Sequence, residues 1–316
     1  MIDVHARRNA DRRIDNPSAS IQVARMFPHF LGIGAPRTGT TWLHTNLARH
    51  PKVWMPPMKE IHYFDRPDQP LGQRLRGRYN NDRNARERLL GALTSAPWKW
   101  RRSDVFWLSR FLLLPRSDDW YRSLFPVDHV GLVGEITPSY ARLGEERVEW
   151  IHSLMPDSRM IYFLRNPIEM AWSMAVTATR HSRRRPIQNW PAERVIRRVT
   201  AAVVTAHADY AGNLERWEKI YGPDRILIAF HEDLKKDPLG LYRRVLAFLD
   251  LGDVDDQDVI VEPVNQRSVA FDSTPYLPAM AAHYRGAILR THQRFQNAYT
   301  AEWVEKTERI LRDRPA

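Results

Sequence analysis

A glycine-framed loop between an apolar run and a helical pattern constrains the fold of this chain more than any other feature. The apolar residues at 29–35 predict a buried strand, and Leu43 and Leu47 continue at helical spacing after the loop. Gly34 and Gly39 frame the loop, and glycine lets a backbone approach a ligand without a Cβ in the way. In such a unit, N–H groups of the loop and of the first helical turn converge on an anion. The segment therefore predicts a phosphate-binding cradle, although a tight turn without a ligand has the same pattern.

The loop departs from a Walker A phosphate-binding loop where that loop carries its chemistry. Gly34 and Gly39 have the GxxxxG spacing, but Thr40 and Thr41 follow where a nucleoside triphosphatase has a lysine and a hydroxyl residue. That lysine contacts the outer phosphates, and the hydroxyl contacts a magnesium ion. The cation of this loop, Arg37, lies inside it instead. The pattern therefore disfavours ATP hydrolysis.

A second strand–helix junction follows more than a hundred residues later. Residues 159–165 predict another buried strand, and Pro167 suits the first position of the next helix. Arg165 ends the strand and Ser173 lies eight residues further on, so both side chains can reach the same junction. Ligands of an open parallel sheet bind at the carboxyl ends of its strands. The junction and the glycine-framed loop are therefore both expected where ligands of such a sheet bind.

Strands and helices alternate along most of the chain. Apolar runs predict strands near 29–35, 53–55, 131–136, 159–165 and 225–231. Helical patterns are expected at 40–49, 144–154, 168–180, 191–220 and 239–250, and in a terminal helix that includes Trp303, Thr307, Ile310 and Leu311. This alternation predicts an α/β, P-loop-like three-layer fold with a central parallel sheet flanked by helices.

On these segments the chain resembles the sulfotransferases that use 3′-phosphoadenosine 5′-phosphosulfate (PAPS) as the sulfonate donor. Their loop for the 5′-phosphosulfate has the form basic–Ser/Thr–Gly–Thr–Thr–Trp. The matching residues, preceded by Pro36, are Arg37, Thr38, Gly39, Thr40, Thr41 and Trp42. The resemblance implies that these residues bind the 5′ end of the donor and that Trp42 stacks on the adenine. A tryptophan in the first turn of a helix suits a core position equally well.

The resemblance extends to the 3′ end of the donor. An arginine at a strand end and a serine in the next helix bind the 3′-phosphate in this family, which assigns that role to Arg165 and Ser173. Arg267 falls in the loop that makes the family's last donor contact, and it could also be a surface charge. Residues 134–140 match a strand-end segment beside the donor, and residues 210–234 match the family's late helix, strand and Glu-Asp-Leu turn. The resemblance thus implies two separate anion pockets, about a nucleotide's length apart, that hold opposite ends of the donor.

Residues 58–65 supply candidates for the chemistry, which needs a base for the proton of an acceptor hydroxyl. They resemble the Lys-Glu-x-His-aromatic-Phe signature of the glycosaminoglycan, or heparan-sulfate, branch of the family. The resemblance assigns the base to Glu60, with His62 as the alternative because an imidazole titrates near neutrality. Lys59 would position Glu60 or the sulfonate; on a solvated loop all three would be surface groups. Ile136 stands where the branch often has lysine, which weakens any transfer of its polysaccharide specificity.

The resulting hypothesis is an enzyme that moves a sulfonate from PAPS to an acceptor hydroxyl by in-line displacement and releases adenosine 3′,5′-bisphosphate. Arg37 and the loop amides would bind the 5′-phosphosulfate and stabilise charge on the leaving oxygen, and no metal is required. The acceptor would be a saccharide, a glycolipid or another small molecule. One alternative is a P-loop small-molecule kinase that uses ATP and magnesium. Another is a non-catalytic protein that binds anions or nucleic acid.

Composition limits the chemistry and the partners. The chain has no cysteine, which excludes disulfides, thiolate metal sites and a cysteine nucleophile. Its twelve histidines form no HExxH pair, so zinc hydrolysis is not expected. The net charge of +11 suits an anionic donor and can steer an anionic acceptor. Nothing resembles a nucleic-acid-binding module, so we expect no nucleic-acid partner.

We expect residues 28–316 to form a single domain, preceded by a basic, flexible N-terminal arm at 1–27. An irregular insertion near 66–128 would form the acceptor side. Its aromatic, leucine and arginine residues suit a pocket wall, core packing or peripheral contact with a membrane. The basic stretch 181–186 would border the acceptor cleft or be a solvated loop. The chain shows neither a membrane-spanning apolar run nor a signal-peptide h-region, so a cytoplasmic enzyme is expected.

Overall fold

One parallel sheet forms the centre of the described part of the molecule. The computed structural model describes residues 26–66, 102–126, 129–179, 187–252, 255–262 and 272–313. Within them the sheet has five strands in the order β2-β3-β1-β4-β5, and every pairing is parallel. The strands are β1 (Phe30–Gly34), β2 (Val53–Trp54), β3 (Leu132–Ile136), β4 (Arg159–Leu164) and β5 (Ile226–Phe230). Their carboxyl ends therefore lie along one edge, where ligands bind in open α/β folds.

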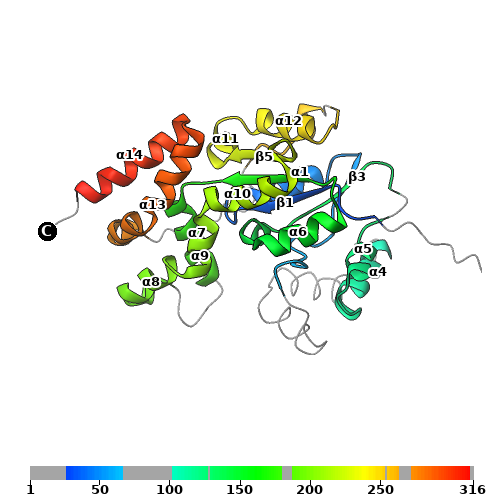
Figure 1. The fold of residues 1–316 in the computed structure, drawn as a ribbon, viewed down its shortest axis with the longest axis horizontal. Helices are drawn as coiled ribbons and strands as arrows, with labels where there is room; N and C mark the ends of the chain where they lie inside the picture. The colour runs from blue at the N-terminus through cyan, green and yellow to red at the C-terminus, as the bar shows by residue number, and fades with distance from the viewer. Residues whose placement is uncertain are drawn as a thin grey trace, which may run out of the picture.

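Helices cover both faces of the sheet and both of its ends (Figure 1). The α-helices are α1 (Thr40–Leu47), α4 (Arg102–Leu113), α5 (Asp118–Ser123), α6 (Glu145–Leu154), α7 (Pro167–Thr179), α8 (Ala192–Val199), α9 (Ala202–Ala208), α10 (Tyr210–Tyr221), α11 (His231–Lys236), α12 (Pro238–Phe248), α13 (Leu277–Phe295) and α14 (Ala298–Arg312). The 3₁₀ helices are η2 (Pro138–Arg142), η3 (Ile187–Asn189), η4 (Pro223–Arg225), η5 (Asp256–Asp258) and η6 (Thr274–Tyr276). In Figure 1, α4 and α5 lie at one end of the molecule, and α13 and α14 lie at the other.

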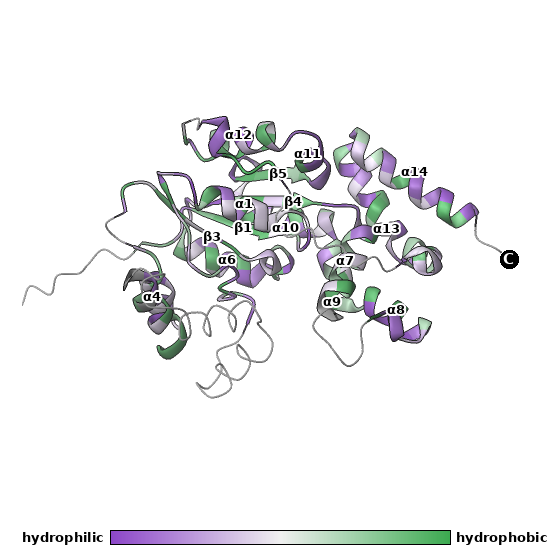
Figure 2. Cartoon of the chain, turned by 180° about the vertical axis from the view of Figure 1, so that it is seen from behind, coloured by the Kyte–Doolittle hydropathy of each residue, from purple (hydrophilic) through white to green (hydrophobic). Residues whose placement is uncertain are grey.

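Alternate residues of the central strand β1 face two separate helical layers. Leu31 and Ile33 belong to a core cluster that includes buried residues of α6, α7 and α10. Phe30, which points to the other face, belongs to a cluster with buried residues of α1 and α12. Because side chains alternate along a strand, one apolar run supplies both cores. Figure 2 shows the strands largely in the colour of apolar residues. The predicted three-layer α/β fold is confirmed.

The predicted strands are all present, but the long helix expected at 191–220 is wrong. That segment forms α8, α9 and α10, with breaks at Thr200 and Asp209. A straight helix of this length would extend for about 45 Å, much further than one face of this sheet. The breaks let Val195 of α8 and Trp217 of α10 both be buried, at 0% exposure each, against different parts of the core.

Several sequence predictions lie outside the described residues. These are most of the N-terminal arm, the insertion at 67–101, the basic stretch 181–186 and Arg267. Among the residues that are described, no helix combines the length and the apolar character needed to cross a membrane.

Candidate active site

Hydrogen bonds and packing within the protein fix the conformation of the loop after β1. The Thr38 hydroxyl donates to the carbonyl oxygen of Ala35 at 2.7 Å, and the Thr38 carbonyl lies 3.0 Å from Nδ1 of His231. Gly39 precedes α1 with a φ of 110°, and a Cβ there would lie 2.5 Å from Leu234. Glycine at 39 is therefore required by the left-handed backbone and by packing, whether or not a ligand approaches.

The N-terminus of α1 can accept an anion. Within the described part of the chain, no side-chain hydrogen bond caps this end, and the first turn of α1 contains no acidic residue. Such N–H groups need acceptors, and the helix dipole favours a negative group there. Strand β1 ends at the same point, so the sequence prediction of a cradle at a strand end agrees with this local geometry.

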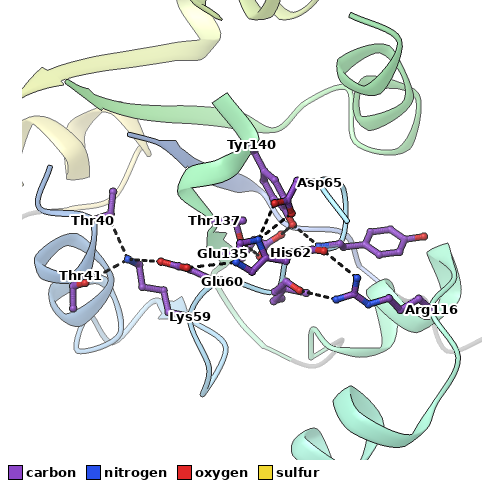
Figure 3. Close-up of polar contacts among 12 residues, drawn as sticks. Thr40, Thr41, Lys59, Glu60, His62, Asp65, Arg116, Glu135, Thr137 and Tyr140 are labelled. Carbon is purple, nitrogen blue, oxygen red and sulfur yellow. Dashed lines mark hydrogen bonds and ion pairs between the residues drawn. The ribbon is translucent and has the colours of Figure 1, made fainter. Parts of the chain in front are cut away.

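Lys59 places a cation on this helix end from another segment of the chain. Its ammonium group donates to the hydroxyl of Thr40 at 2.9 Å, lies 3.4 Å from that of Thr41, and lies 3.4 Å from Glu60 Oε1 (Figure 3). The side chain of Lys59 is only 15% exposed. Burial lowers the pKa of Lys59 more than the neighbouring carboxylate raises it. Lys59 thus places a cation at the helix end, where the lysine of a Walker A loop, absent from this loop, would contact the phosphates.

Glu60, His62 and Asp65 form a continuous polar chain. His62 Nε2 lies 3.5 Å from Glu60 Oε2, and its Nδ1 lies 2.9 Å from Asp65 Oδ2. Burial alone would raise the pKa of Glu60, but the hydrogen bond from His62 and the charge of Lys59 outweigh it and lower the pKa to about 2. Burial alone would lower the pKa of His62, but hydrogen bonds to Asp65 and Glu60 outweigh it and raise the pKa. Glu60 is therefore ionised at neutral pH.

The turn that carries these groups has an unusual backbone. Glu60 and His62 have φ values of 67° and 57°, in the left-handed region that costs non-glycine residues about 1–2 kcal/mol each. The Glu60 N–H donates to the carbonyl of Ile136 at 3.1 Å. Arg116 donates to the carbonyl oxygens of Ile61 at 3.2 Å and of His62 at 3.1 Å. These contacts from β3 and from the segment before α5 hold the turn in place.

The raised pKa of His62 predicts how stability depends on pH. A raised folded-state pKa gives stabilisation that is fully present below the unfolded value of about 6.5 and is lost as pH rises through the folded value. We therefore expect His62→Gln to lower the free energy of unfolding more at pH 5.5 than at pH 9. Urea denaturation of both proteins across this range measures the difference. A gap that stays constant or widens with pH would contradict the assignment.

The structure brings the second predicted junction into contact with the loop. Arg165 Nη1 donates to the carbonyl oxygen of Arg37 at 3.0 Å, and Arg37 Nε donates to the Ser173 hydroxyl at 2.9 Å. Arg165 also pairs with Glu169 at 3.0 Å, and Glu169 lies 3.2 Å from Lys306. The two groups of anion-binding candidates are therefore adjacent, so one small nucleotide can reach both. These contacts bring the Arg37 side chain to α7, and the expected separation of the two pockets by about a nucleotide's length stays a prediction.

Two residues near the site were not among the predicted site residues. His207 on α9 is 3% exposed, and its Nδ1 has no hydrogen-bond partner among the described residues. Burial lowers the pKa of His207 to about 4, with smaller electrostatic effects of Arg142, Asp65 and Glu60. Glu135 at the end of β3 is also buried. An isolated histidine in an alanine-rich stretch matches no catalytic motif, so only the tertiary structure shows where His207 lies. Glu135 falls in the 134–140 segment that the resemblance places beside the donor, but that match assigns it no role.

Trp42 is buried in this structure. Its side chain is 1% exposed, its indole N–H donates to the carbonyl oxygen of Ile260 at 2.5 Å, and its ring meets Tyr242 edge-on at 6.1 Å. These contacts agree with the alternative of a core position on the first turn of α1, and stacking on an adenine stays a prediction.

Among the described residues, no group of three or more histidine, aspartate, glutamate or cysteine side chains is arranged to hold a metal ion. The fold and site thus define an α/β protein with an anion-binding helix end, cations on both sides of it, and an adjacent ionised carboxylate.

Comparison with known proteins names the family. The chain matches the Sulfotransferase family profile over residues 28–256 and belongs to that family. Over 147 residues it is 30% identical to human heparan sulfate glucosamine 3-O-sulfotransferase 6 and 29% identical to the mouse protein. Each alignment covers 42% of this chain and 39% of the relative, so the similarity spans about two fifths of those proteins.

Solved structures support the fold. A sulfotransferase from Alicyclobacillus acidocaldarius superposes with a TM-score of 0.57 at 21% identity, covering 88% of this chain and 99% of that one. The sulfotransferase domain of the Synechococcus PCC 7002 olefin synthase superposes with a TM-score of 0.51 at 20% identity, covering 92% and 96%. At these identities the likeness shows a shared fold.

Proposed function

We propose that this chain transfers a sulfonate from PAPS to an acceptor hydroxyl. The observation that carries the proposal is the position of Lys59, whose ammonium group contacts both the hydroxyls at the start of α1 and the Glu60 carboxylate. A cation at an anion-binding helix end and a base beside it are what such a transfer needs. Membership of the Sulfotransferase family, whose members generally use PAPS, supports the same reaction.

The residues present fit such a donor. The uncapped N-terminus of α1, with Thr40 and Thr41, would hold the 5′-phosphosulfate. Arg165 and Ser173 would hold the 3′-phosphate, and Arg37 lies between them and the loop. The geometry favours an exchange of roles relative to the sequence hypothesis. Lys59 would be the cation on the 5′ side, and the side chain of Arg37 would serve the 3′ side.

In the proposed step the acceptor oxygen bonds to sulfur while the bond from sulfur to the bridging phosphate oxygen breaks. The acceptor proton passes to the Glu60 carboxylate, and adenosine 3′,5′-bisphosphate leaves with the bond's electron pair. Lys59 would stabilise the charge on the leaving oxygen. The raised pKa of His62 and its two carboxylate contacts favour Glu60 over His62 as the base, because a protonated imidazole cannot accept a proton. His62 would instead keep Glu60 ionised and oriented.

We propose a saccharide hydroxyl as the acceptor, with glycolipids and other small molecules as alternatives. The support is the Lys59–Asp65 segment and the similarity to enzymes named for heparan sulfate glucosamine. We also propose that residues 28–316 act as one sulfotransferase domain. The family profile covers residues 28–256, and buried residues of α13 and α14 belong to the same core cluster as Leu31 of β1.

Isothermal titration calorimetry tests the donor. We expect adenosine 3′,5′-bisphosphate to bind more tightly than ATP with magnesium. The reason is that the loop and the Arg165–Ser173 pair, which are in contact through Arg37, would each bind one of its two phosphate groups. Tighter binding of ATP–magnesium would favour the kinase alternative. Binding that falls steeply with salt and shows no preference for the bisphosphate, without transfer from labelled PAPS to a panel of glucosamine oligosaccharides, glycolipids and phenols, would favour the non-catalytic alternative.

A further inference from the structure

A buried carboxylate lies beside the Glu60–His62 turn, and the step described above does not use it. Glu135, in strand β3, is 1% exposed. Its Oε1 accepts hydrogen bonds from the hydroxyls of Tyr121 at 2.6 Å and Tyr140 at 3.0 Å, and its Oε2 accepts one from Thr137 at 3.1 Å. Figure 3 shows Glu135 beside Thr137 and Tyr140. Burying a carboxylate costs free energy even when it is hydrogen-bonded, so three donors gathered on one group point to a specific role.

The Tyr140 hydroxyl connects this carboxylate to the main chain of the turn. The N–H of Tyr63 donates to the Tyr140 oxygen at 2.9 Å. Since an N–H group can only donate, the hydroxyl accepts this bond and directs its single proton to Glu135. Glu135 therefore fixes the orientation in which Tyr140 can receive the Tyr63 N–H.

Tyr121, the other tyrosine on Glu135, contacts the same residue of the turn. Its ring stacks on the ring of Tyr63 with the centroids 4.8 Å apart and the planes at 14°. The Tyr63 hydroxyl in turn donates to Asp118 of α5 at 2.7 Å. Glu135 thus holds two tyrosines, one of which binds the main chain of Tyr63 and the other its ring.

The turn is consequently tied to the end of β3 at two points. The N–H of Glu60 bonds the main chain of Ile136, and the N–H of Tyr63 reaches Glu135 through Tyr140. The left-handed residues Glu60 and His62 lie between these two ties, and such conformations persist only where the surroundings over-determine them.

We propose that Glu135 is a positioning residue for the transfer reaction: through Tyr140 it holds the turn that presents Glu60 to the acceptor. The inference rests on the proposed function. In this role Glu135 contacts neither substrate. It needs only to accept, at Oε1, the hydrogen bonds that the hydroxyls of Tyr121 and Tyr140 donate.

The requirement for an acceptor predicts which substitutions are tolerated. Burial raises the pKa of Glu135 to about 7, against the hydrogen bonds from Tyr121, Tyr140 and Thr137 that lower it. In either protonation state Oε1 can accept both tyrosine hydroxyls while a proton on Oε2 can be donated to Thr137. A glutamine offers the same pattern, with its carbonyl oxygen towards the tyrosines and its amide towards Thr137. A methionine has a similar length and offers only a weak acceptor.

The test compares Glu135→Gln, Glu135→Met and Tyr140→Phe with the wild-type protein. Hydrogen exchange of the peptide covering residues 60–64 reports the turn directly, because the Tyr63 amide is the donor in question. We expect faster exchange there in Glu135→Met and Tyr140→Phe, and wild-type exchange in Glu135→Gln. With labelled PAPS and a glucosamine oligosaccharide, kcat should fall about 10–100-fold in the first two variants and less than about 3-fold in the third. The Kd of adenosine 3′,5′-bisphosphate should not change.

Tyr221→Phe is the matched control, since its buried hydroxyl bonds the carbonyl oxygen of Met155, which belongs neither to the turn nor to the contacts of Glu135. If wild-type exchange at 60–64 and wild-type kcat persist in both Glu135→Met and Tyr140→Phe, the positioning role is refuted while the proposed function stands. A loss of kcat in Glu135→Gln as large as in Glu135→Met would also refute it, because a charged group in the reaction would then be indicated. Absence of both bisphosphate binding and transfer in the wild-type protein would refute the proposed function, and the inference with it.

Discussion

Glu60→Gln is expected to reduce turnover about 10²–10⁴-fold, equivalent to about 3–5 kcal/mol in the activation barrier, while leaving donor binding close to wild type. Glutamine keeps the size of the side chain and its contact with Lys59, but it cannot take a proton from an acceptor hydroxyl. The measurements are kcat with labelled PAPS and the calorimetric Kd of adenosine 3′,5′-bisphosphate. A large loss of kcat at constant Kd would support the assignment of the base.

Glu145→Gln is the matched control for this experiment. Glu145 opens α6 and forms an ion pair with Lys219 outside the site, so its substitution removes one carboxylate without touching the proposed chemistry. Undiminished turnover of Glu60→Gln would move the base elsewhere, with His62 the first residue to test. A loss of turnover accompanied by an equal loss of bisphosphate affinity would show that Glu60 mainly holds Lys59 in the donor cradle.

Arg165→Ala should weaken adenosine 3′,5′-bisphosphate about 10²-fold and adenosine 5′-phosphosulfate much less. The reason is that Arg165 would pair with the 3′-phosphate, and losing one partner of a hydrogen-bonded charge pair costs binding energy. A nucleotide without a 3′-phosphate has no such pair to lose. The guanidinium is 19% exposed and is already held in place by Glu169 and the carbonyl of Arg37, so little ordering is needed when a phosphate binds. Calorimetry with the two nucleotides measures the difference, since the second lacks the 3′ group.

The matched control is Arg159→Ala, at the opposite end of the same strand. Arg159 bonds the carbonyl of Phe248 and pairs with Asp250, far along β4 from the carboxyl edge. It should leave both affinities unchanged. Equal losses for the two nucleotides in Arg165→Ala would mean that the arginine acts through the loop, by way of its bond to the Arg37 carbonyl, and would remove the 3′-phosphate assignment.

Local patterns predicted the elements that meet at the site. The apolar runs before Arg37 and before Asn166 are buried strands because five to six consecutive apolar residues in an α/β chain can be covered on both faces. The strand–loop–helix order also predicted that the cradle and Arg165 lie at one edge of the sheet. These conclusions needed only neighbouring residues and the rule that parallel strands end together.

Long-range contacts decided what the same residues do. The sequence could not show that Lys59 reaches Thr40, because the two are nineteen residues apart and only the folded path of the chain between them brings them together. It allowed Trp42 either role, and only the structure shows that Trp42 packs against Ile260 and Tyr242. The 191–220 helix was wrong for a similar reason, since helical periodicity does not reveal where a helix must bend to keep its apolar face on a core.

By itself the sequence determined that this chain builds a parallel sheet with an anion-binding loop after its first strand, and that Lys59, Glu60 and His62 follow that loop. Those features depend on the order and spacing of residues along the chain. Only the tertiary structure decided that Lys59 lies on the α1 terminus, that Arg37 turns to Ser173, and that Glu135 lies beneath the turn. Side-chain position and ionisation depend on groups that are distant in sequence and close in space, because burial and hydrogen bonding act only over a few ångströms.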